Sequence, residues 1–343
     1  MKIGDFFQNK GVYIIAEVSQ NHDGSLGQAH AFIDAVAETG ADAIKFQTHI
    51  AEEESTPSEP FRINFSYCDK TRYDYWRRME FTEEQWFGLF QHANEKGLDF
   101  LSSPFSEAAL HMLDKIGVPA WKFGSGEVFN ERLLKMAVST GKPIILSTGL
   151  STFFDIDKQV QIVRNAGNDI LIMQCTTEYP SSPETIALNV IPEYMQRYNC
   201  PVGLSDHSAT IFPSLAAVTL GARAIEVHVT LSRKMFGPDI KASVTIEELE
   251  TIVSGTHYIE KMLNNKGDKN VIKSNQKELK RIFSKSIYAK SDIEEGSMIE
   301  EKHLAIKKPY CGIDAADYNK VIGLKAKEKI CKDTAVEWEM VEK

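Results

Sequence analysis

Several features that mark particular classes of protein are missing from this sequence. No apolar run among its 343 residues approaches the ~20 residues that a membrane-spanning helix needs, and the first ten residues lack the apolar core of a secretory signal. The five cysteines are scattered without a CxxC pair, which fits a reducing compartment better than a disulfide framework or a zinc site. These absences predict a cytoplasmic protein with no membrane partner.

Positive charge is also in short supply. The chain has 39 lysines and arginines against 48 aspartates and glutamates, and this balance argues against a nucleic-acid partner. If the ligand is an anion, its counter-charge must therefore come from a few local residues. The apolar content of 43% is ordinary for a globular protein with a sizeable core, and the length suits one large domain, alone or with a small one.

Strand-like and helix-like segments alternate from residue 11 to residue 262. Segment 27–40, for example, has apolar residues at helical spacing and ends on Gly40, a typical C-terminal stop. Eight such units predict a closed (β/α)8 TIM barrel, because mostly apolar strands that alternate with helices form a parallel sheet covered on its outside. The alternative is a doubly wound open sheet, but no GxGxxG motif follows the first strand. The predicted strands are 12–18, 42–48, 98–103, 120–123, 143–148, 170–176, 201–205 and 223–229.

The character of the chain changes after residue 262. A polar, charged stretch is followed by short β-rich pieces that predict a separate small domain with little core of its own. The predicted organisation is a catalytic barrel over 1–265, a linker over 266–284 and a small β-rich domain over 285–343.

One connection within the barrel is unusually long. Residues 49–81 separate the second predicted strand from its helix, and a loop of this length in a barrel is usually functional. Its Arg62, Arg72, Tyr75 and Trp76 suit a lid over a polar substrate. The alternative is a surface excursion with no role in the site.

Polar residues mark the carboxyl ends of all eight predicted strands. In a parallel barrel these ends converge on the functional face, so the coincidence predicts one shared site. The residues concerned are Glu17, Lys45, Gln47, Ser102, Ser103, Lys122, Ser125, Ser147, Thr176, Tyr179, Ser205, Asp206, His207, Glu226 and His228.

Two lysines in this set indicate an anionic ligand. Lys45 and Lys122 lie inside apolar runs, where an unpaired charge is costly, so a bound phosphate or carboxylate is a natural partner. Ser125, Ser147 and Ser205 each stand within two residues of a glycine, and such hydroxyls and their backbone N–H groups can surround phosphate oxygens. The alternatives are snorkelling lysines and ordinary turns.

Two histidines in the set are candidate metal ligands. His207 and His228 end neighbouring strands, and two imidazoles suit manganese, cobalt, iron or zinc while leaving coordination positions for substrate and water. The alternative is a pair of hydrogen-bonded core histidines. Glu17 and Glu226 suit acid–base groups or partners that orient the metal ligands, and spacing does not choose between these roles.

Taken together, these motifs resemble the sialic acid synthase family, which includes the legionaminic and pseudaminic acid synthases. Members of this family condense phosphoenolpyruvate with N-acylated amino sugars. The tail from Arg281 to Ile313 resembles the small antifreeze-like (SAF) domain that these synthases carry. The matching barrel stretches, in order, are IIAEVSQNHDGSL, GADAIKFQTH, LSSPFS, WKFGSGE, KPIILSTG, QCTTEYP, VGLSDHS, IEVHVT and GPDIKASV.

The resemblance implies roles for individual residues. His207 and His228 would bind a divalent metal, usually manganese, with magnesium or cobalt as alternatives. Glu17, Lys45, Lys122 and Glu226 would form the catalytic centre, with Glu17 the first choice for proton transfer near the sugar oxygen. Phosphoenolpyruvate would contact the two lysines and Ser103, Ser125, Ser147, Thr177 and Ser205, and the sugar would face Glu17, Gln47, Glu127, Tyr179 and Asp239.

The resemblance also implies a domain-swapped homodimer, in which the SAF domain covers the partner's site. In the family, the arginine of a KRPG motif in that domain contacts the N-acyl group of the sugar. Here the corresponding sequence is KKPY, with Lys308 in place of the arginine and Tyr310 in place of the glycine. Thr177 stands where the family often has asparagine. These departures do not affect the residues expected to carry the chemistry, but they leave the identity of the sugar undetermined.

The expected function is therefore metal-dependent condensation of phosphoenolpyruvate with an amino sugar, giving a nonulosonic acid and phosphate. N-acetylmannosamine and a 6-deoxy diacetamido hexose are the candidate sugars. The alternatives are condensation with a phosphorylated sugar, or a carbohydrate-binding barrel without activity.

Overall fold

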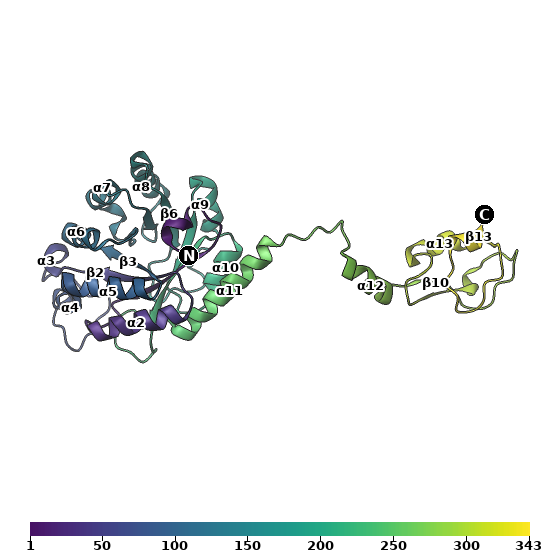
Figure 1. Ribbon diagram of the computed structural model, residues 1–343, viewed down its shortest axis with the longest axis horizontal. Coiled ribbons are helices and arrows are strands. Elements are labelled where there is room, and N and C mark those ends of the chain that lie inside the picture. The colour runs from purple at the N-terminus through teal and green to yellow at the C-terminus, as the bar shows by residue number, and fades with distance from the viewer. The chain divides into compact units, whose positions relative to one another are not determined.

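The computed structural model describes residues 1–343, and the chain divides into two compact units, Met1–Asn265 and Lys266–Lys343. The first unit contains eight parallel strands in the order β3-β2-β1-β8-β7-β6-β5-β4, and β3 and β4 contact each other so that the ring is nearly closed (Figure 1). The strands are β1 (Tyr13–Ser19), β2 (Ala43–Thr48), β3 (Asp99–Pro104), β4 (Trp121–Phe123), β5 (Ile144–Ser147), β6 (Ile170–Cys175), β7 (Val202–Asp206) and β8 (Ala224–Thr230). The predicted TIM barrel is confirmed, and each predicted strand agrees to within one residue at either end.

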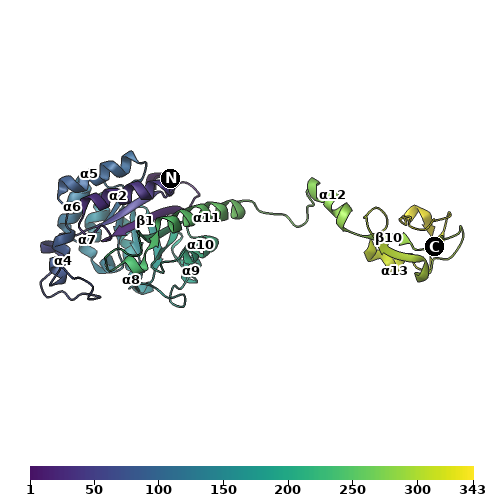
Figure 2. The same ribbon diagram turned by 90° about the horizontal axis from the view of Figure 1, so that it is seen from below.

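Eight main helices cover the outside of the barrel, as the turned view also shows (Figure 2). Their ends follow local chemistry: α2 stops before Gly40, whose φ of 79° suits a residue without a Cβ. The helices are α2 (Leu26–Glu38), α5 (Glu83–Glu95), α6 (Glu107–Ile116), α7 (Glu131–Ser139), α8 (Phe153–Ala166), α9 (Val190–Tyr198), α10 (Phe212–Thr219) and α11 (Ile246–Asn264). A two-residue strand, β9 (Val244–Thr245), pairs with β8 just before α11.

The inside of the barrel changes from apolar to polar or charged along most of the strands. On β1 the alternation of a strand points Tyr13, Ile15 and Glu17 inward, while Ile14 and Ala16 join the core under the helices. The inner apolar cluster near the amino ends includes residues of six strands and is completed by the short helix α1 (Ile3–Phe6). The base is therefore packed with apolar side chains, and inward polar groups gather at the carboxyl ends.

The 49–81 connection, called the lid segment below, is more ordered than the single loop that the sequence suggested. It contains α3 (Ala51–Glu54) and α4 (Arg72–Met79). A capping box between Thr71 and Asp74 starts α4, whose Tyr75, Trp76 and Met79 are buried in a small cluster with Ala51. The segment thus has an apolar core of its own.

The second unit is β-rich, as predicted. Its hairpins pair β10 (Ser286–Ala289) with β11 (Leu304–Lys307) and β12 (Lys325–Ala326) with β13 (Val341–Glu342), and it also has the short helix α13 (Tyr318–Val321). Part of the segment predicted as a linker forms α12 (Ser274–Phe283), because Leu279, Ile282 and Phe283 recur at helical spacing. Short 3-10 turns occur at Glu127–Phe129, Ile240–Ala242, Glu301–His303, Ala315–Asp317 and Trp338–Met340. None of the helices in either unit has the length and apolarity needed to cross a membrane.

Candidate active site

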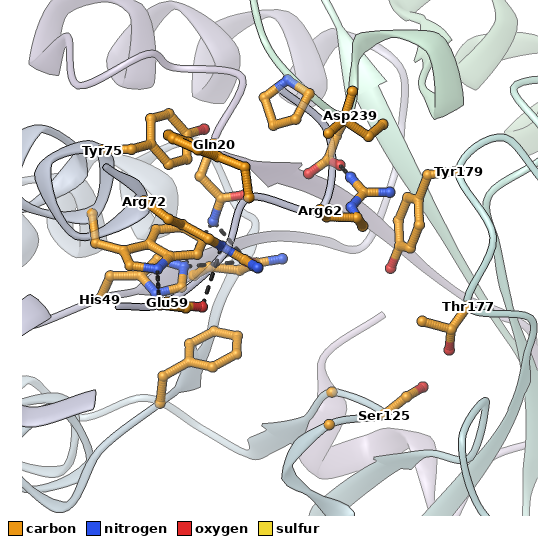
Figure 3. Close-up of a pocket in the computed structure, with 18 of the residues that line it drawn as sticks. Gln20, His49, Glu59, Arg62, Arg72, Tyr75, Ser125, Thr177, Tyr179 and Asp239 are labelled. Atoms are coloured by element: carbon orange, nitrogen blue, oxygen red, sulfur yellow. Dashed lines mark hydrogen bonds and ion pairs between the residues drawn. The ribbon is translucent and has the colours of Figure 1, made fainter. Parts of the chain in front are cut away.

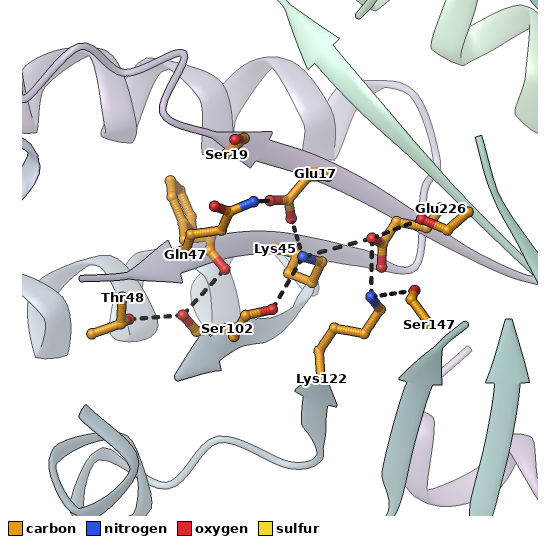
Figure 4. Close-up of polar contacts among 12 residues, drawn as sticks. Glu17, Ser19, Lys45, Gln47, Thr48, Ser102, Lys122, Ser147 and Glu226 are labelled. Atoms are coloured by element: carbon orange, nitrogen blue, oxygen red, sulfur yellow. Dashed lines mark hydrogen bonds and ion pairs between the residues drawn. The ribbon is translucent and has the colours of Figure 1, made fainter. Parts of the chain in front are cut away.

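Four charged side chains meet inside the carboxyl end of the barrel. Lys45 Nζ lies 2.6 Å from Glu17 Oε2 and 3.6 Å from Glu226 Oε1, and Lys122 Nζ lies 3.4 Å from the same Glu226 oxygen (Figure 4). All four residues are at most 3% exposed. Charges this deeply buried are tolerated only when they are paired, so the two lysines and two glutamates form one interdependent network.

Three predicted serines surround this network. Lys122 Nζ donates to Ser147 Oγ at 2.8 Å, and Lys45 Nζ lies 3.4 Å from Ser103 Oγ. The hydroxyl of Ser205 donates to the Glu226 carboxylate at 3.3 Å. The structure thus brings the residues predicted to hold an anion into direct contact with one another.

The network shifts the pKa values of its two carboxyl groups in opposite directions. Burial alone would raise the pKa of Glu226, but the ammonium groups of Lys122 and Lys45 together outweigh it and lower this pKa to about 2. For Glu17, burial dominates over the attraction of Lys45, and its pKa is raised. Burial lowers the pKa of Lys122, whereas at Lys45 the effect of burial is overcome by the two carboxylates and the pKa is raised. Glu17 is therefore the carboxyl group better suited to hold and release a proton.

His207 and His228 lie together beside this network. Their ring centres are 5.0 Å apart, and the Tyr179 ring stacks on His207 at 4.1 Å. Burial lowers the pKa of His207 to about 3 and that of His228 to about 4, so both imidazoles are neutral and able to bind a metal.

The hydrogen bonds of the two histidines fit metal binding. His207 Nδ1 lies 2.7 Å from the carbonyl oxygen of Thr176, which makes Nδ1 the donor and leaves Nε2 with a free lone pair. His228 Nδ1 is buried without a hydrogen-bond partner. The structure contains no group of three or more histidine, cysteine or carboxylate side chains placed to hold a metal ion, so a metal here would have two protein ligands.

A cavity of about 480 Å³ has His228 on its wall. Figure 3 shows Ser125, Thr177, Tyr179 and Asp239 around it. Burial raises the pKa of Glu127, one of the predicted residues on its wall. Lys308 is different, since it belongs to the second unit and is exposed there. The predicted residues that line the cavity are Gln47, Ser125, Glu127, Thr177, Tyr179, His228 and Asp239.

The lid segment reaches into this cavity through Arg62. Its Nη2 donates to Asp239 Oδ1 at 2.6 Å, and its guanidinium lies 4.2 Å from the centre of the Tyr179 ring. Ser19 Oγ lies 2.7 Å from the other Asp239 oxygen. Arg62 therefore connects the lid to the loops after β6 and β8, and closes one side of the cavity.

Ser125 and Thr177 form a narrow cradle around Gly149. Gly149 N donates to Ser125 Oγ at 3.0 Å, and the buried hydroxyl of Thr177 has no partner. A Cβ at position 149 would lie 2.4 Å from Thr177 Oγ1 and 2.8 Å from Ser125 Oγ, so a side chain here would push both hydroxyls away.

Sequence reasoning missed part of the cavity wall. His49 directly follows β2 and Gln20 directly follows β1, so the rule that located the other strand-end residues could have found both. Glu54 and Glu59 had no such signal, because they reach the cavity only through the fold of the lid segment.

The fold and site together define a TIM-barrel enzyme with a buried pair of lysines and a pair of neutral histidines at its mouth. The model of the NeuB family matches residues 32–268, and that of the SAF domain matches residues 284–342. The chain belongs to the NeuB family, which confirms the resemblance seen in its motifs.

Individual relatives agree with this assignment. The chain is 34% identical over 320 residues to an N,N'-diacetyllegionaminic acid synthase of Campylobacter jejuni, covering 92% of this chain and 95% of that protein. It is 34% identical over 337 residues to a pseudaminic acid synthase of the same organism, covering 96% of each. The crystal structure of an N-acetylneuraminic acid (sialic acid) synthetase from Leptospira borgpetersenii matches with a TM-score of 0.69 and 32% identity, over 78% of this chain and 90% of that chain.

The cradle leads to a first testable prediction. We expect Gly149→Ala to raise the Kd for phosphoenolpyruvate by about tenfold or more, because the new methyl group displaces the hydroxyls of Ser125 and Thr177. Calorimetric titration measures the effect. Gly88→Ala is the control, since a Cβ at this helical glycine meets no atom within 4 Å. Equal affinity of the two variants would show that the cradle does not hold the ligand.

Proposed function

We propose that this chain condenses phosphoenolpyruvate with an unphosphorylated N-acylated amino sugar to give a nonulosonic acid and phosphate. The observation that carries the proposal is the buried lysine–glutamate network directly beside the histidine pair. Relatives named as synthases of legionaminic and pseudaminic acid support the same reaction class. N-acetylmannosamine and 6-deoxy diacetamido hexoses are the candidate sugars.

Phosphoenolpyruvate suits the anion-binding half of the site. Its phosphate and carboxylate would form ion pairs with the ammonium groups of Lys45 and Lys122. In the structure these ammonium groups pair with Glu17 and Glu226. Serine hydroxyls and the cradle at Gly149 add neutral donors around these charges. The low pKa of Glu226 keeps a fixed negative charge next to the ligand.

A divalent metal suits the two histidines. We propose manganese, with magnesium or cobalt as alternatives, held by His207 and His228 with substrate and water at the other positions. When bound, such an ion would polarise the aldehyde of the open-chain sugar.

The chain's own residues supply the remaining chemistry. C3 of phosphoenolpyruvate forms a bond to the aldehyde carbon, and Glu17 delivers a proton to the aldehyde oxygen. The positive charge that develops at C2 is stabilised by the nearby Glu226 carboxylate. Water then adds to C2 and gives one proton to Glu17, which has passed its own to the aldehyde oxygen. The bond between C2 and the bridging phosphate oxygen breaks, the remaining hydroxyl proton goes to the departing phosphate, and the keto group forms.

The charges of the lid favour a sugar without phosphate. A phosphorylated sugar needs a second cluster of free cations, but Arg62 is paired with Asp239 and Arg72 with Glu59. Further carboxylates line the same end of the cavity, so the local field repels a second phosphate. The cavity wall also has apolar side chains that suit an acyl methyl group or a deoxy carbon of the sugar. These are Phe61, Ile63, Phe65 and Leu150.

A substrate panel tests the reaction and both alternatives. We expect phosphate release from phosphoenolpyruvate and Mn²⁺ with at least one free amino sugar, and slower release with N-acetylmannosamine 6-phosphate than with N-acetylmannosamine. Turnover only with phosphorylated sugars would overturn the preference for a free sugar. No release with any sugar, from protein with demonstrably bound metal, would favour the non-catalytic carbohydrate-binding barrel.

The metal site gives a separate prediction. We expect His228→Ala to abolish stoichiometric Mn²⁺ binding and metal-dependent turnover, because only one imidazole remains. Electron paramagnetic resonance of free Mn²⁺ measures binding, and circular dichroism checks the fold. His111→Ala, a change at an exposed helical histidine, is the control. Unchanged Mn²⁺ affinity in His228→Ala would remove the histidine pair as the metal site.

We further propose a cytoplasmic, domain-swapped homodimer. All five cysteines are free thiols, which supports a reducing compartment. Three apolar residues of α12 are exposed within the single chain, and such a face suits burial in an oligomer: Leu279, Ile282 and Phe283.

The role of Lys308 follows from this assembly. We expect sedimentation to give twice the mass of the 38.5 kDa chain. We also expect Lys308→Ala to raise KM for the sugar severalfold, with little change in KM for phosphoenolpyruvate. Lys302→Ala, an exposed lysine of the same unit, serves as the control. A monomer, or an unchanged KM for the sugar, would contradict the proposed contact.

A further inference from the structure

His49 occupies an unusual place on the cavity wall. The side chain is buried, and its ring lies between two aromatic rings in parallel, with centres 4.0 Å from Trp76 and 4.4 Å from Phe105. Its Nδ1 lies 2.5 Å from Glu54 Oε1 of the lid segment. Its Nε2 lies 2.8 Å from the amide nitrogen of Gln20. An imidazole held flat and bonded at both nitrogens has a single orientation.

The hydrogen bonds that leave His49 have a defined direction. A carboxylate only accepts hydrogen bonds, so Glu54 places the ring proton on Nδ1 and leaves the lone pair on Nε2. This lone pair requires a donor, which turns the NH₂ of Gln20 toward His49. The other N–H of Gln20 is donated to Gln47 Oε1 at 2.7 Å. Each link therefore determines the next.

The chain of hydrogen bonds ends at the catalytic network. Because Gln47 Oε1 accepts from Gln20, the NH₂ of Gln47 faces Glu17 and donates to its Oε1 at 2.9 Å. Glu17 Oε1 accepts at one end of the chain and Glu54 Oε1 accepts at the other, so the directions agree throughout. Gln20 uses both of its N–H groups, whereas Gln47 has a second N–H left and lines the cavity.

We infer that His49 and Glu54 are positioning residues that present Gln47 to the sugar as a hydrogen-bond donor. This inference rests on the proposed function and names how the sugar is recognised: an oxygen acceptor, carbonyl or hydroxyl, meets the free N–H of Gln47. A flipped Gln47 amide would offer an oxygen instead, which repels a carbonyl and forces a hydroxyl to turn its own proton toward Gln47. The pair acts from the lid, so folding of α3 sets the polarity of a residue on β2.

Replacement of the ring nitrogens separates this role from simple packing. His49→Phe retains a flat ring between Trp76 and Phe105 but has no nitrogen. We expect it to raise KM for the amino sugar by about tenfold or more, the loss of about one hydrogen bond, with KM for phosphoenolpyruvate within about twofold of the parent. His49→Gln restores an acceptor for Gln20 and should recover part of the loss. If His49→Phe has the same KM for the amino sugar as the parent, the inference is overturned.

Glu54→Gln provides a second variant that disturbs the packing less. An amide either donates or accepts, so it no longer forces the ring proton onto Nδ1, and we expect a smaller rise in KM for the sugar than in His49→Phe. Glu52→Gln is the matched control, since Glu52 lies on the same short helix and pairs only with the exposed Arg77. Equal kinetics of the two glutamine variants would also overturn the inference. Thermal unfolding confirms that each variant is folded.

The ring tautomer gives a test that does not depend on turnover. With ¹⁵N-labelled histidine, and His49→Phe to assign the signal, NMR should find the proton of His49 on Nδ1 in the parent and a mixture of tautomers in Glu54→Gln. A proton on Nε2 in the parent would overturn the inference even in an active enzyme. A parent inactive with every sugar would overturn the proposed function, while the tautomer still decides the hydrogen-bond chain.

Discussion

The pairing of buried charge at the carboxyl end of the barrel is the constraint on which the rest of the site depends. Lys45 and Lys122 are nearly inaccessible to water, so each ammonium needs a carboxylate or an anionic ligand next to it. Glu17 and Glu226 supply that partner from the two strands β1 and β8. In the proposed function, the same arrangement that makes these lysines tolerable also serves as the anion-binding site.

The charged chamber depends in turn on the apolar base beneath it. Strand alternation gives every strand an inward row, and the row is apolar below and polar above, as Ile15 and Glu17 illustrate on β1. The apolar layers, completed by α1, fill the interior and exclude water from one side of the network. Burial raises the pKa of Glu17, whereas the ammonium groups of Lys122 and Lys45 outweigh burial at Glu226 and lower its pKa.

In the proposed function, recognition of the sugar falls to a different part of the chain from the chemistry. The chemical groups stand on the strands, whereas the lid segment contributes the contacts that approach from the side, through Arg62 and through the pair of His49 and Glu54. Substitutions in the lid can therefore alter which sugar fits while the lysine–glutamate network is preserved. The departures at Thr177 and Lys308 also lie outside that network.

The sequence by itself determined the barrel, its eight strands and the polar residues at their ends, because strand periodicity and strand-end chemistry are local properties that a pattern such as Tyr13, Ile15 and Glu17 records directly. Family membership followed from the same strand-end motifs. The tertiary structure alone decided which groups pair. Arg62 meets Asp239 across 177 residues of sequence, and the hydrogen-bond chain from Glu54 to Glu17 passes back and forth between two separate segments, 17–20 and 47–54. Such contacts depend on barrel closure and on the fold of the lid, which set distances through space that spacing along the chain does not encode.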